Sequence, residues 1–309
     1  MTTAQVSVCI CTYRRPERLG ILLASLAAQT RLPQEVVVVD NDAEGSARAT
    51  VEQAAAQAPF PVRYDIQPVK NISLTRNRTI ALASGEWLGL LDDDEQVIPE
   101  WLERLLATQA AHDADGVLGP VVCQVPDSAP GWIRAGAFYA LPRFGTGEVA
   151  PLNRIGIGNA LLRASLLRRE MADGQGPFDP AFGLSGGEDA DLLFRLVNRH
   201  QARLIWCDEA LATEPVEPNR LSLQWLMRRS LRGGQDNARH FLNGRLGPNG
   251  LAARASYFLR AAAQSSAGLL LSVLTLPLGR HHAVNWLRKA YGNYGKLSLL
   301  WGSTYLEYK

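Results

Sequence analysis

The sequence lacks the features that mark several common classes of protein. Its 309 residues include only four cysteines, and the one close pair, Cys9 and Cys11, has the wrong gap for a redox or zinc-binding pair. Residues 1–5 run directly into an apolar, strand-like segment, without the charged start and separate apolar stretch of a signal peptide. No internal repeat or low-complexity tract is evident. We therefore expect buried thiols, an N-terminus that belongs to the fold, and a cytoplasmic protein.

Acidic residues are scarce in the last third of the chain. Residues 215–309 contain 13 Lys and Arg but only 3 Asp and Glu, whereas residues 1–214 contain 19 and 27. The net charge of +2 therefore hides an acidic body and a basic tail. We predict one domain over residues 1–214 and a helical extension over residues 215–309.

The body begins with a β-α-β pattern. Val6 to Cys11 and Glu35 to Val39 are short β-branched runs, and Arg18 to Gln29 between them has apolar residues at helical spacing. Such a unit implies parallel neighbouring strands with a right-handed crossover. The alternation continues with a helix from Ser46 to Gln57, a strand from Val62 to Ile66, a helix from Ser73 to Ala83 and a strand from Trp87 to Leu91. This pattern predicts an α/β fold, a doubly wound and mostly parallel sheet covered on both faces.

The second half of the body is less regular. Residues 126–154 are rich in Pro and Gly and are predicted to form a long loop over the polar residues that end the strands. Around this loop we expect a helix from Glu100 to His112, a strand from Val117 to Val125, helices from Ala160 to Glu170 and from Ala190 to His200, and a strand from Arg203 to Cys207.

Four consecutive acids, Asp92-Asp93-Asp94-Glu95, follow the predicted strand Trp87 to Leu91. They would repel one another unless solvent or a cation neutralised them, and carboxylates are the ligands that Mg²⁺ or Mn²⁺ prefers. An ion that holds a diphosphate also stabilises the charge on that group when it leaves. The alternative is an acidic turn that caps the next helix.

Other polar residues also follow predicted strands or begin predicted helices. Asp40 could accept hydrogen bonds from a ribose or from the imide N–H of uracil, or it could cap the following helix. Arg76 could pair with the carboxylates or with a donor phosphate, or lie on a solvated helix face. Gly186 and Gly187 allow close approach of a ligand, and Glu188 or Asp189 could act as a general base or cap a helix. Strand ends of an open α/β sheet share one edge, which favours a single site.

Taken in order, these segments resemble the motifs of the family 2 glycosyltransferases, including members that assemble bacterial exopolysaccharides and envelopes. The resemblance covers residues 6 to about 207 and depends on the order and spacing of the motifs. The segments are Val6-Ser7-Val8-Cys9-Ile10-Cys11-Thr12-Tyr13-Arg14-Arg15, Val39-Asp40-Asn41, Arg76-Asn77, Leu91-Asp92-Asp93-Asp94 and Gly187-Glu188-Asp189-x-Asp191-Leu192.

The resemblance implies a GT-A fold, with a nucleotide-sugar half at about residues 1–95 and an acceptor half at about residues 96–214. It implies an inverting enzyme that uses a nucleotide-diphosphate sugar and a divalent metal ion, Mg²⁺ or Mn²⁺. Asp189 would be the catalytic base, with Glu188 orienting the acceptor or repelling the base as a like charge. Asp94 and Asp92 would bind the metal. The donor would contact Thr12, Tyr13, Arg15, Asp40, Arg76, Asp92 and Asp93. In the acceptor half, Trp132 of the loop 126–154 is a candidate sugar-stacking residue.

Two departures from the commoner family pattern affect this interpretation. Asn41-Asp42-Ala43-Glu44 replaces a Ser/Thr-rich stretch, which weakens the inference about the base. Uracil is preferred because Asp40 suits an imide donor, but thymine presents the same group and guanine has an N–H of its own. The Gln-x-x-Arg-Trp motif of processive synthases is absent, which favours the addition of a single sugar.

The basic tail suggests attachment to an anionic membrane surface. Arginines alternate with aromatic residues there, and residues 261–279 carry no charge, enough for a spanning or an in-plane helix. With the family resemblance, this predicts a lipid-linked saccharide as acceptor and a peripheral position on the inner face of the cell membrane. The alternative is a helical subdomain that packs on the sheet or forms a homodimer. The acidic body argues against nucleic-acid binding.

Other functions explain fewer of the motifs. A soluble or protein acceptor would suit the same catalytic residues. A hydrolase or nucleotidyltransferase would not account for the ordered match, and no phosphate-binding Gly-rich loop follows the first strand. A catalytically silent module that binds nucleotide sugars is the remaining alternative from a different class.

Overall fold

The structure is a computed structural model that describes residues 4–152, 156–172, 176–303 and 305–306. The chain divides into two compact units, which we call the sheet unit and the helical unit. The sheet unit comprises residues 4–123 and 141–214, and the helical unit comprises residues 124–140 and 215–306. Each unit is described by itself.

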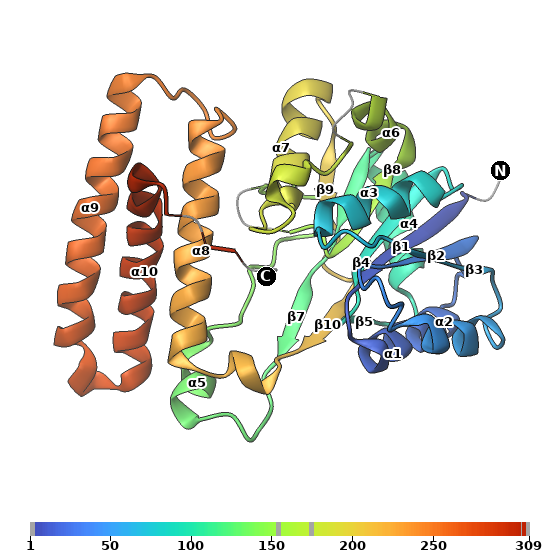
Figure 1. Ribbon diagram of the computed structural model, residues 1–309, viewed down its shortest axis with the longest axis horizontal. Helices are drawn as coiled ribbons and strands as arrows, with labels where there is room; N and C mark the ends of the chain where they lie inside the picture. The colour runs from blue at the N-terminus through green and yellow to red at the C-terminus, as the bar shows by residue number, and fades with distance from the viewer. Residues whose placement is uncertain (1–3, 153–155, 173–175, 304, 307–309) are drawn as a thin grey trace. The chain divides into compact units, whose positions relative to one another are not determined.

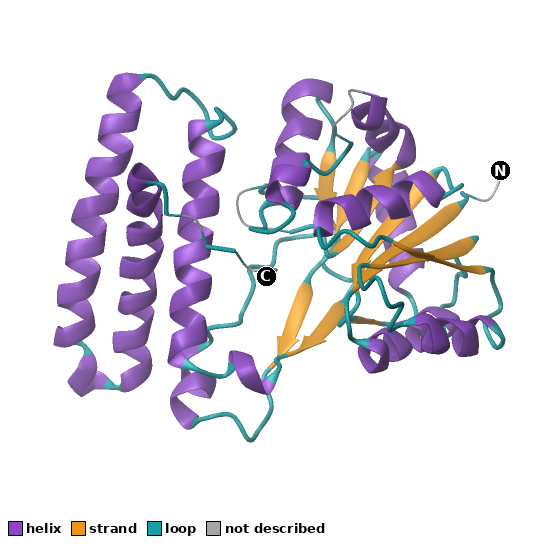
Figure 2. Ribbon diagram, viewed as in Figure 1, coloured by secondary structure: helices purple, strands orange, loops and turns teal. Residues whose placement is uncertain are grey.

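The sheet unit contains a seven-stranded sheet with the strand order β3-β2-β1-β4-β8-β6-β9. β8 runs antiparallel to both of its neighbours, whereas the other neighbouring strands of this sheet are parallel to each other. Figure 2 shows these strands in orange. Their bounds are β1 (Val6–Thr12), β2 (Glu35–Asp40), β3 (Val62–Ile66), β4 (Trp87–Asp92), β6 (Gly116–Leu118), β8 (Asn159–Arg163) and β9 (Leu204–Trp206).

Helices cover both faces of this sheet (Figure 1). Along β2, Val36 and Val38 belong to one apolar cluster and Val37 and Val39 to the other, because successive strand residues point to opposite faces. The first cluster includes residues of α1 (Pro16–Ala27), α2 (Arg48–Ala55) and α4 (Trp101–His112). The second includes residues of α3 (Ile72–Leu82), α6 (Ala164–Ala172) and α7 (Glu188–His200). The predicted doubly wound, mostly parallel sheet is confirmed.

Two predictions of local structure were wrong. The helix predicted from Ala160 begins only at Ala164, because residues 159–163 form β8, buried between β4 and β6. A short apolar run of this kind has no periodicity that separates a buried strand from a helix.

The strand predicted from Val117 to Val125 is two strands. It breaks at Gly119 and Pro120, and a proline cannot donate to a strand ladder. The second piece, β7 (Val121–Gln124), joins a separate three-stranded sheet with β5 (Gln96–Val97) and β10 (Ala212–Pro215).

The loop predicted over residues 126–154 also differs. It contains a short helix, α5 (Gly131–Gly136), and residues 124–140 belong to the helical unit, where α5 contacts α10. The guanidinium of Arg280 lies 4.5 Å from the ring centroid of Trp132, which we had expected to stack on a sugar. That ring face is therefore engaged within the helical unit.

The helical unit consists mainly of three long helices, α8 (Leu223–Leu242), α9 (Leu251–Leu274) and α10 (Arg280–Ser298), with α10 packed against both others. Glycines allow close approach of α8 and α10: a Cβ atom on Gly234 would lie 1.8 Å from the carbonyl oxygen of Gly292. No helix in the described part of the chain is long and apolar enough to cross a membrane. Short 3-10 turns occur at η1 (Pro180–Phe182), η2 (Pro218–Arg220), η3 (Leu276–Leu278) and η4 (Leu299–Trp301).

Candidate active site

The ends of β1 and β4 bring the first site residues together. β1 lies between β2 and β4, and its register places Cys11 beside Asp92 and Thr12 beside Asp40. The turn after β4 then carries Asp93 and Asp94 back toward the end of β1. The predicted edge of the sheet is thus the place where the acidic cluster lies.

Asp93 is the point at which this turn is fixed to β1. Its carboxylate accepts a hydrogen bond from the hydroxyl of Thr12 at 2.8 Å, and one from the backbone N–H of Tyr13 at 3.4 Å. Arg15 donates to Asp93 at 3.2 Å and to Asp94 at 2.8 Å. Thr12, Tyr13 and Arg15, which we predicted beside the donor, therefore contact the acidic cluster.

A second arginine compensates the other acids. The Arg76 Nη2 donates to Asp92 at 2.9 Å, and its Nε lies 3.7 Å from the carboxylate of Glu188. Arg76 is largely buried, whereas the Asp92 side chain is 47% exposed. Of the two partners that the sequence suggested for Arg76, carboxylate or phosphate, the structure has the carboxylates.

The N-terminus of α7 brings the predicted base to the same place. Gly186 and Gly187 have φ angles of +83° and +96°, a left-handed backbone that glycine adopts most readily. Glu188 and Asp189 occupy the first turn of α7, where the helix dipole favours negative charge. Asp189 is partly exposed, and its Oδ1 accepts a hydrogen bond from the N–H of Ala190 at 2.8 Å.

Two glycines that the sequence analysis did not assign to the site, Gly156 and Gly158, border the acidic cluster. A Cβ atom on Gly158 would lie 2.9 Å from Oδ2 of Asp92, and one on Gly156 would lie 3.0 Å from Oδ2 of Asp189. The backbone of residues 156–158 therefore runs beside both carboxylates. The signal in the sequence was the pair of glycines spaced two residues apart, directly before the buried β8.

Burial and mutual repulsion raise the pKa values of four acids in the cluster, and Asp92 is one of them, with Arg76 opposing the shift. Burial raises the pKa of Asp93 to about 6, with Arg15 opposing the shift and Asp94 adding to it. The pKa of Glu188 rises to about 7, first through burial and then through repulsion by Asp189, while Arg76 opposes the shift. Burial also raises the pKa of Glu95, which we had placed only in the acidic run, well above its usual range.

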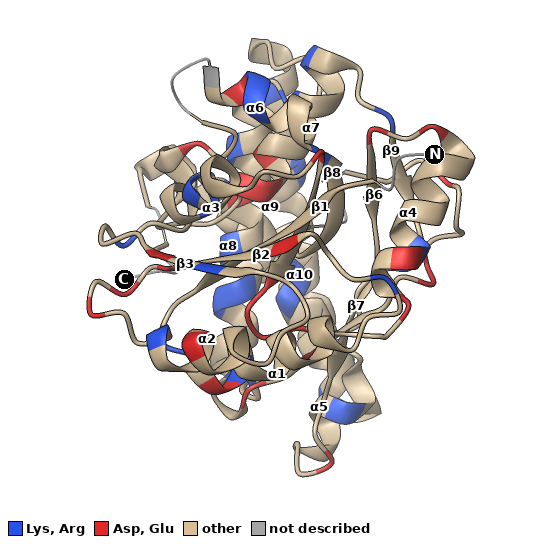
Figure 3. Cartoon of the chain, turned by 90° about the vertical axis from the view of Figure 1, so that its right-hand side faces the viewer, with Lys and Arg blue, Asp and Glu red and all other residues tan. Residues whose placement is uncertain are grey.

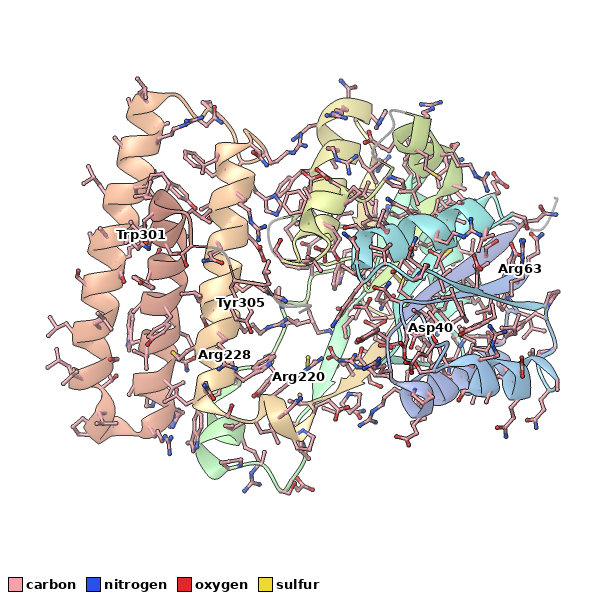
Figure 4. The ribbon with its side chains drawn as sticks, viewed as in Figure 1. Asp40, Arg63, Arg220, Arg228, Trp301 and Tyr305 are labelled. Carbon is pink, nitrogen blue, oxygen red and sulfur yellow. The ribbon has the colours of Figure 1, made fainter. Side chains whose placement is uncertain are left out.

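Asp40 is fully buried at the end of β2, where Figure 4 labels it. Its carboxylate accepts hydrogen bonds from the backbone N–H groups of Asp42 at 2.9 Å and Ala47 at 2.8 Å, and from the hydroxyl of Tyr64 at 3.0 Å. Since Ala47 is the N-cap residue of α2, this is the capping role that the sequence left as the alternative. The contact with a nucleotide stays a prediction, and because the Asp40 side chain is fully buried it requires the surrounding residues to move.

Asn77 of α3 and Asn71, the N-cap residue of that helix, hold the segment before α7. Asn77 donates to the carbonyl of Phe178 at 2.8 Å and accepts from its N–H at 2.9 Å. Asn71 donates to the carbonyl of Pro180 at 3.0 Å. Because Arg76 lies on the same helix, these bonds fix the base-bearing turn relative to the arginine that pairs with the acids.

The donor set suits a hard divalent cation that also binds substrate. Asp92 and Asp94 supply carboxylate oxygens in a partly open turn, the ligands that Mg²⁺ and Mn²⁺ prefer. In the described ranges, no cluster of three or more His, Cys, Asp or Glu side chains is arranged to hold a metal. An ion held by one or two carboxylates needs phosphate and water oxygens to complete its coordination. These residues therefore fit a metal that arrives with a diphosphate.

Sequence comparison identifies relatives over most of the chain. The family model described as "Glycosyl transferase family 2" matches residues 7–173. The chain is 42% identical to "Succinoglycan biosynthesis protein ExoM" from Rhizobium meliloti over 245 residues, which cover 77% of this chain and 75% of that protein. It is 26% identical to "Glucosyl-dolichyl phosphate glucuronosyltransferase" from Haloferax volcanii, over 73% of this chain and 74% of that protein.

Solved structures share the fold at low sequence identity. The mannosyltransferase PcManGT from Pyrobaculum calidifontis, in complex with GDP-Man and Mn²⁺, matches with a TM-score of 0.64 and 17% identity, covering 97% of this chain and 88% of that one. The S. aureus TarS fragment in complex with UDP has a TM-score of 0.55 and 19% identity, covering 97% and 93%. The predicted GT-A fold is confirmed by these neighbours. Because the family model matches more than half of the sequence, and the ExoM relative extends the similarity over three quarters of it, this chain belongs to glycosyl transferase family 2.

Proposed function

We propose that this glycosyltransferase is an inverting enzyme that moves one sugar from a nucleotide-diphosphate sugar to the hydroxyl of a saccharide acceptor. The observation that carries the proposal is the meeting of the first turn of α7 with the acidic turn after β4. Arg76 pairs with Asp92 on one side and with Glu188 on the other, which holds the two turns together.

Asp189 is the base in this proposal. Its partial exposure leaves it accessible to an acceptor, and its Oδ1 is oriented by the N–H of Ala190 in its own turn. A general base takes the proton from the acceptor hydroxyl as that oxygen attacks the anomeric carbon. The attack proceeds opposite the leaving diphosphate, so the new bond has the inverted configuration. Glu188, with its pKa near 7, orients the acceptor beside the base.

Asp92 and Asp94 would hold a divalent ion on the donor side. When bound, such an ion supplies charge stabilisation for the departing diphosphate. Arg15 and Arg76 are already beside these acids and can turn their guanidinium groups toward the donor phosphates. If Arg15 or Arg76 left its carboxylate partner to bind a donor phosphate, the acidic turn after β4 would lose a contact that now holds it. Donor binding would in this way change the arrangement of the turn.

UDP is the preferred nucleotide and a lipid-linked saccharide the preferred acceptor. Support for UDP comes from TarS structures, which hold UDP or UDP-GlcNAc, whereas PcManGT holds GDP-Man. Support for the acceptor comes from the names of the Rhizobium and Haloferax relatives, one in succinoglycan biosynthesis and one acting on glucosyl-dolichyl phosphate. The proposed setting is surface polysaccharide assembly. A soluble or protein acceptor and a silent nucleotide-sugar-binding module are the competing functions.

The test is release of nucleoside diphosphate from a panel of UDP-, GDP- and dTDP-sugars, with Mg²⁺, with Mn²⁺ and with EDTA. We expect metal-dependent release from one donor, lost in both Asp189→Asn and Asp94→Asn. Donor binding, measured by calorimetry, should be kept in Asp189→Asn and weakened in Asp94→Asn. Binding without release in the wild type, across all acceptors tried, would favour the silent module.

An exposed apolar surface supports membrane association of the helical unit. At the C-terminal end of α9, six large apolar side chains are 49–72% exposed: Leu269, Leu270, Val273, Leu274, Leu276 and Leu278. Arg280 and His282 follow directly and are exposed. An apolar cluster followed by Arg280 fits insertion into an anionic lipid surface, with the guanidinium at the headgroups. We propose that this apolar end of α9 attaches the enzyme to the inner face of the cell membrane.

Vesicle flotation tests this attachment. Replacing Leu276 and Leu278 by serine should weaken binding to phosphatidylglycerol vesicles by about tenfold or more, since each inserted leucine contributes about 1.5–3 kcal/mol. Leu251→Ser is the control, because Leu251 is 88% exposed at the N-terminal end of α9, whereas Leu276 and Leu278 lie in η3, after the C-terminal end of that helix. Equal loss in both variants would exclude the apolar end as the attachment point.

A further inference from the structure

A hollow between α8 and α10 lies entirely within the helical unit. Its volume is about 500 Å³, and Ser230, Gly233 and Asn237 of α8 face Asn285, Arg288 and Lys296 of α10 across it. Figure 3 shows Lys and Arg, in blue, on both helices. Lys289 also lines the hollow, so α10 contributes three cations. The lining contains no acidic side chain.

These cations are not compensated by acids. Among the described residues, no carboxylate lies within ion-pair distance of Arg288, Lys289 or Lys296. The Nε of Arg288 is buried and has no hydrogen-bond partner in the described part of the chain. Lys296 donates to Asn293 at 3.0 Å and lies 5.5 Å from the ring centroid of Tyr257, contacts that supply no negative charge. A buried donor without a partner is costly, and a bound acceptor would remove that cost.

The surroundings add further positive charge. Burial and the neighbouring charge of Arg229 lower the pKa of Arg288, and burial and Arg260 lower the pKa of Lys296. Both shifts mean that the surroundings destabilise the charged forms of Arg288 and Lys296. An anion placed among them would reverse this effect, because it attracts every cation that now repels the others.

The amides and glycine complete a surface that suits a phosphate group. Asn285 and Asn293 carry N–H donors, and no described atom lies within 4 Å of a Cβ added to Gly233. We infer that this hollow is a binding site for a phosphate or diphosphate ester. Arg288 supplies a planar, forked donor, and the two lysines supply point charges. The site is separate from the proposed transfer reaction and does not depend on it.

Gly233 provides a sharp test, because its position is open and helical. Gly233→Glu places a carboxylate among the cations, whereas Gly233→Gln has nearly the same shape without the charge. We would titrate the full chain with inorganic pyrophosphate in EDTA by calorimetry. Binding should be about tenfold weaker or more in Gly233→Glu than in Gly233→Gln, since the new carboxylate competes with the anion. Equal binding in the wild type and both variants would overturn the proposal.

A second arm separates the two sources of such an ester. If the site takes a lipid headgroup, Gly233→Glu should also weaken binding to phosphatidylglycerol vesicles relative to Gly233→Gln, and pyrophosphate should compete with the vesicles. If it takes a soluble phosphate ester, vesicle binding should be the same in both variants while pyrophosphate binding differs. Lys289→Gln removes one of the cations that line the hollow and leaves a polar side chain in its place. We expect this variant to bind pyrophosphate several-fold more weakly than the wild type. Unchanged binding in this variant would also contradict the proposal.

Discussion

The sheet unit and the helical unit differ in how their charged side chains are paired. In the sheet unit, buried acids have arginine partners: Asp93 has Arg15, and Asp191 has Arg195 at 2.7 Å. In the helical unit, Arg288 and its lysine neighbours line a hollow without acids. The net charge of residues 1–214 is negative and that of residues 215–309 is positive. Arg239 pairs with Asp236 on α8, but among the described residues the cations that line the hollow have no acidic partner.

Apolar surface differs in the same way. The sheet unit encloses two large clusters, one on each face of its sheet. The helical unit has few buried large side chains on α9, where only Ala261 and Gly268 are buried, and it exposes leucines at the end of that helix. A region that compensates its own charges and covers its own apolar surface is stabilised from within. The helical unit, which leaves the cations of the hollow without acidic partners and exposes leucines at the end of α9, is suited to bind external ligands.

The largest expected effect is on the rate of sugar transfer, which the proposed function assigns to the sheet unit. Asp189→Asn removes the proposed base and should lower kcat by about 10²–10⁴-fold, the usual contribution of general acid–base catalysis. Asp113→Asn is the matched control, because Asp113 has a left-handed backbone that asparagine tolerates. Activity is measured by release of nucleoside diphosphate. A loss smaller than tenfold in Asp189→Asn would assign the base elsewhere.

The next effect concerns the stability of the sheet unit. Arg195 is buried on α7 and pairs with both Asp191 and Glu170. Arg195→Met leaves two buried carboxylates without their partner and should lower the free energy of unfolding by about 3–5 kcal/mol. Urea denaturation followed by far-UV circular dichroism measures this change. Arg199→Met is the control, since the Arg199 side chain is half exposed and 3.7 Å from Glu170; a similar loss there would contradict the role of burial.

The helical unit has its own sensitive point, where two backbones meet. A Cβ on Gly234 would lie 1.8 Å from the carbonyl oxygen of Gly292, so Gly234→Ala must separate α8 from α10. We expect it to destabilise the chain by about 1–3 kcal/mol, the usual cost of overpacking. Gly233→Ala meets nothing within 4 Å and should be neutral or stabilising by up to about 1 kcal/mol. Differential scanning calorimetry of the two variants measures the change in stability. Equal changes in Gly234→Ala and Gly233→Ala would show that the close contact between α8 and α10 does not limit the side chain at position 234.

The smallest effect is a dependence on pH. The pKa of Glu188 is raised from its ordinary value of 4.5 to about 7, so the folded chain binds more protons than the unfolded chain between these values. Stability should therefore fall as pH rises through this window, by on the order of 1 kcal/mol. Glu188→Gln should flatten the curve, as measured by urea denaturation at pH 5 and pH 7. A wild-type stability that rises over this interval would show that another group dominates.

The sequence by itself determined much of the sheet unit. Periodicity predicted β1 to β4 and the helices between them, because alternating and helical spacing are local properties of the chain. The acidic turn after β4 and the glycines before α7 were visible as motifs. The same holds for the change of composition near Pro215, where acids become scarce.

Only the tertiary structure decided which partners these residues have. Residues 159–163 form a strand because β4 and β6 provide ladder partners from distant parts of the chain, and residues 124–140 pack with the helical unit. Asp191, quoted as part of the motif beside Asp189, pairs with Arg195 inside the unit. Spacing fixes which residues share a strand or a helix face, whereas burial and pairing depend on elements that meet only when the chain has folded. The anion-binding hollow, made by α8 and α10, belongs to that second kind of information.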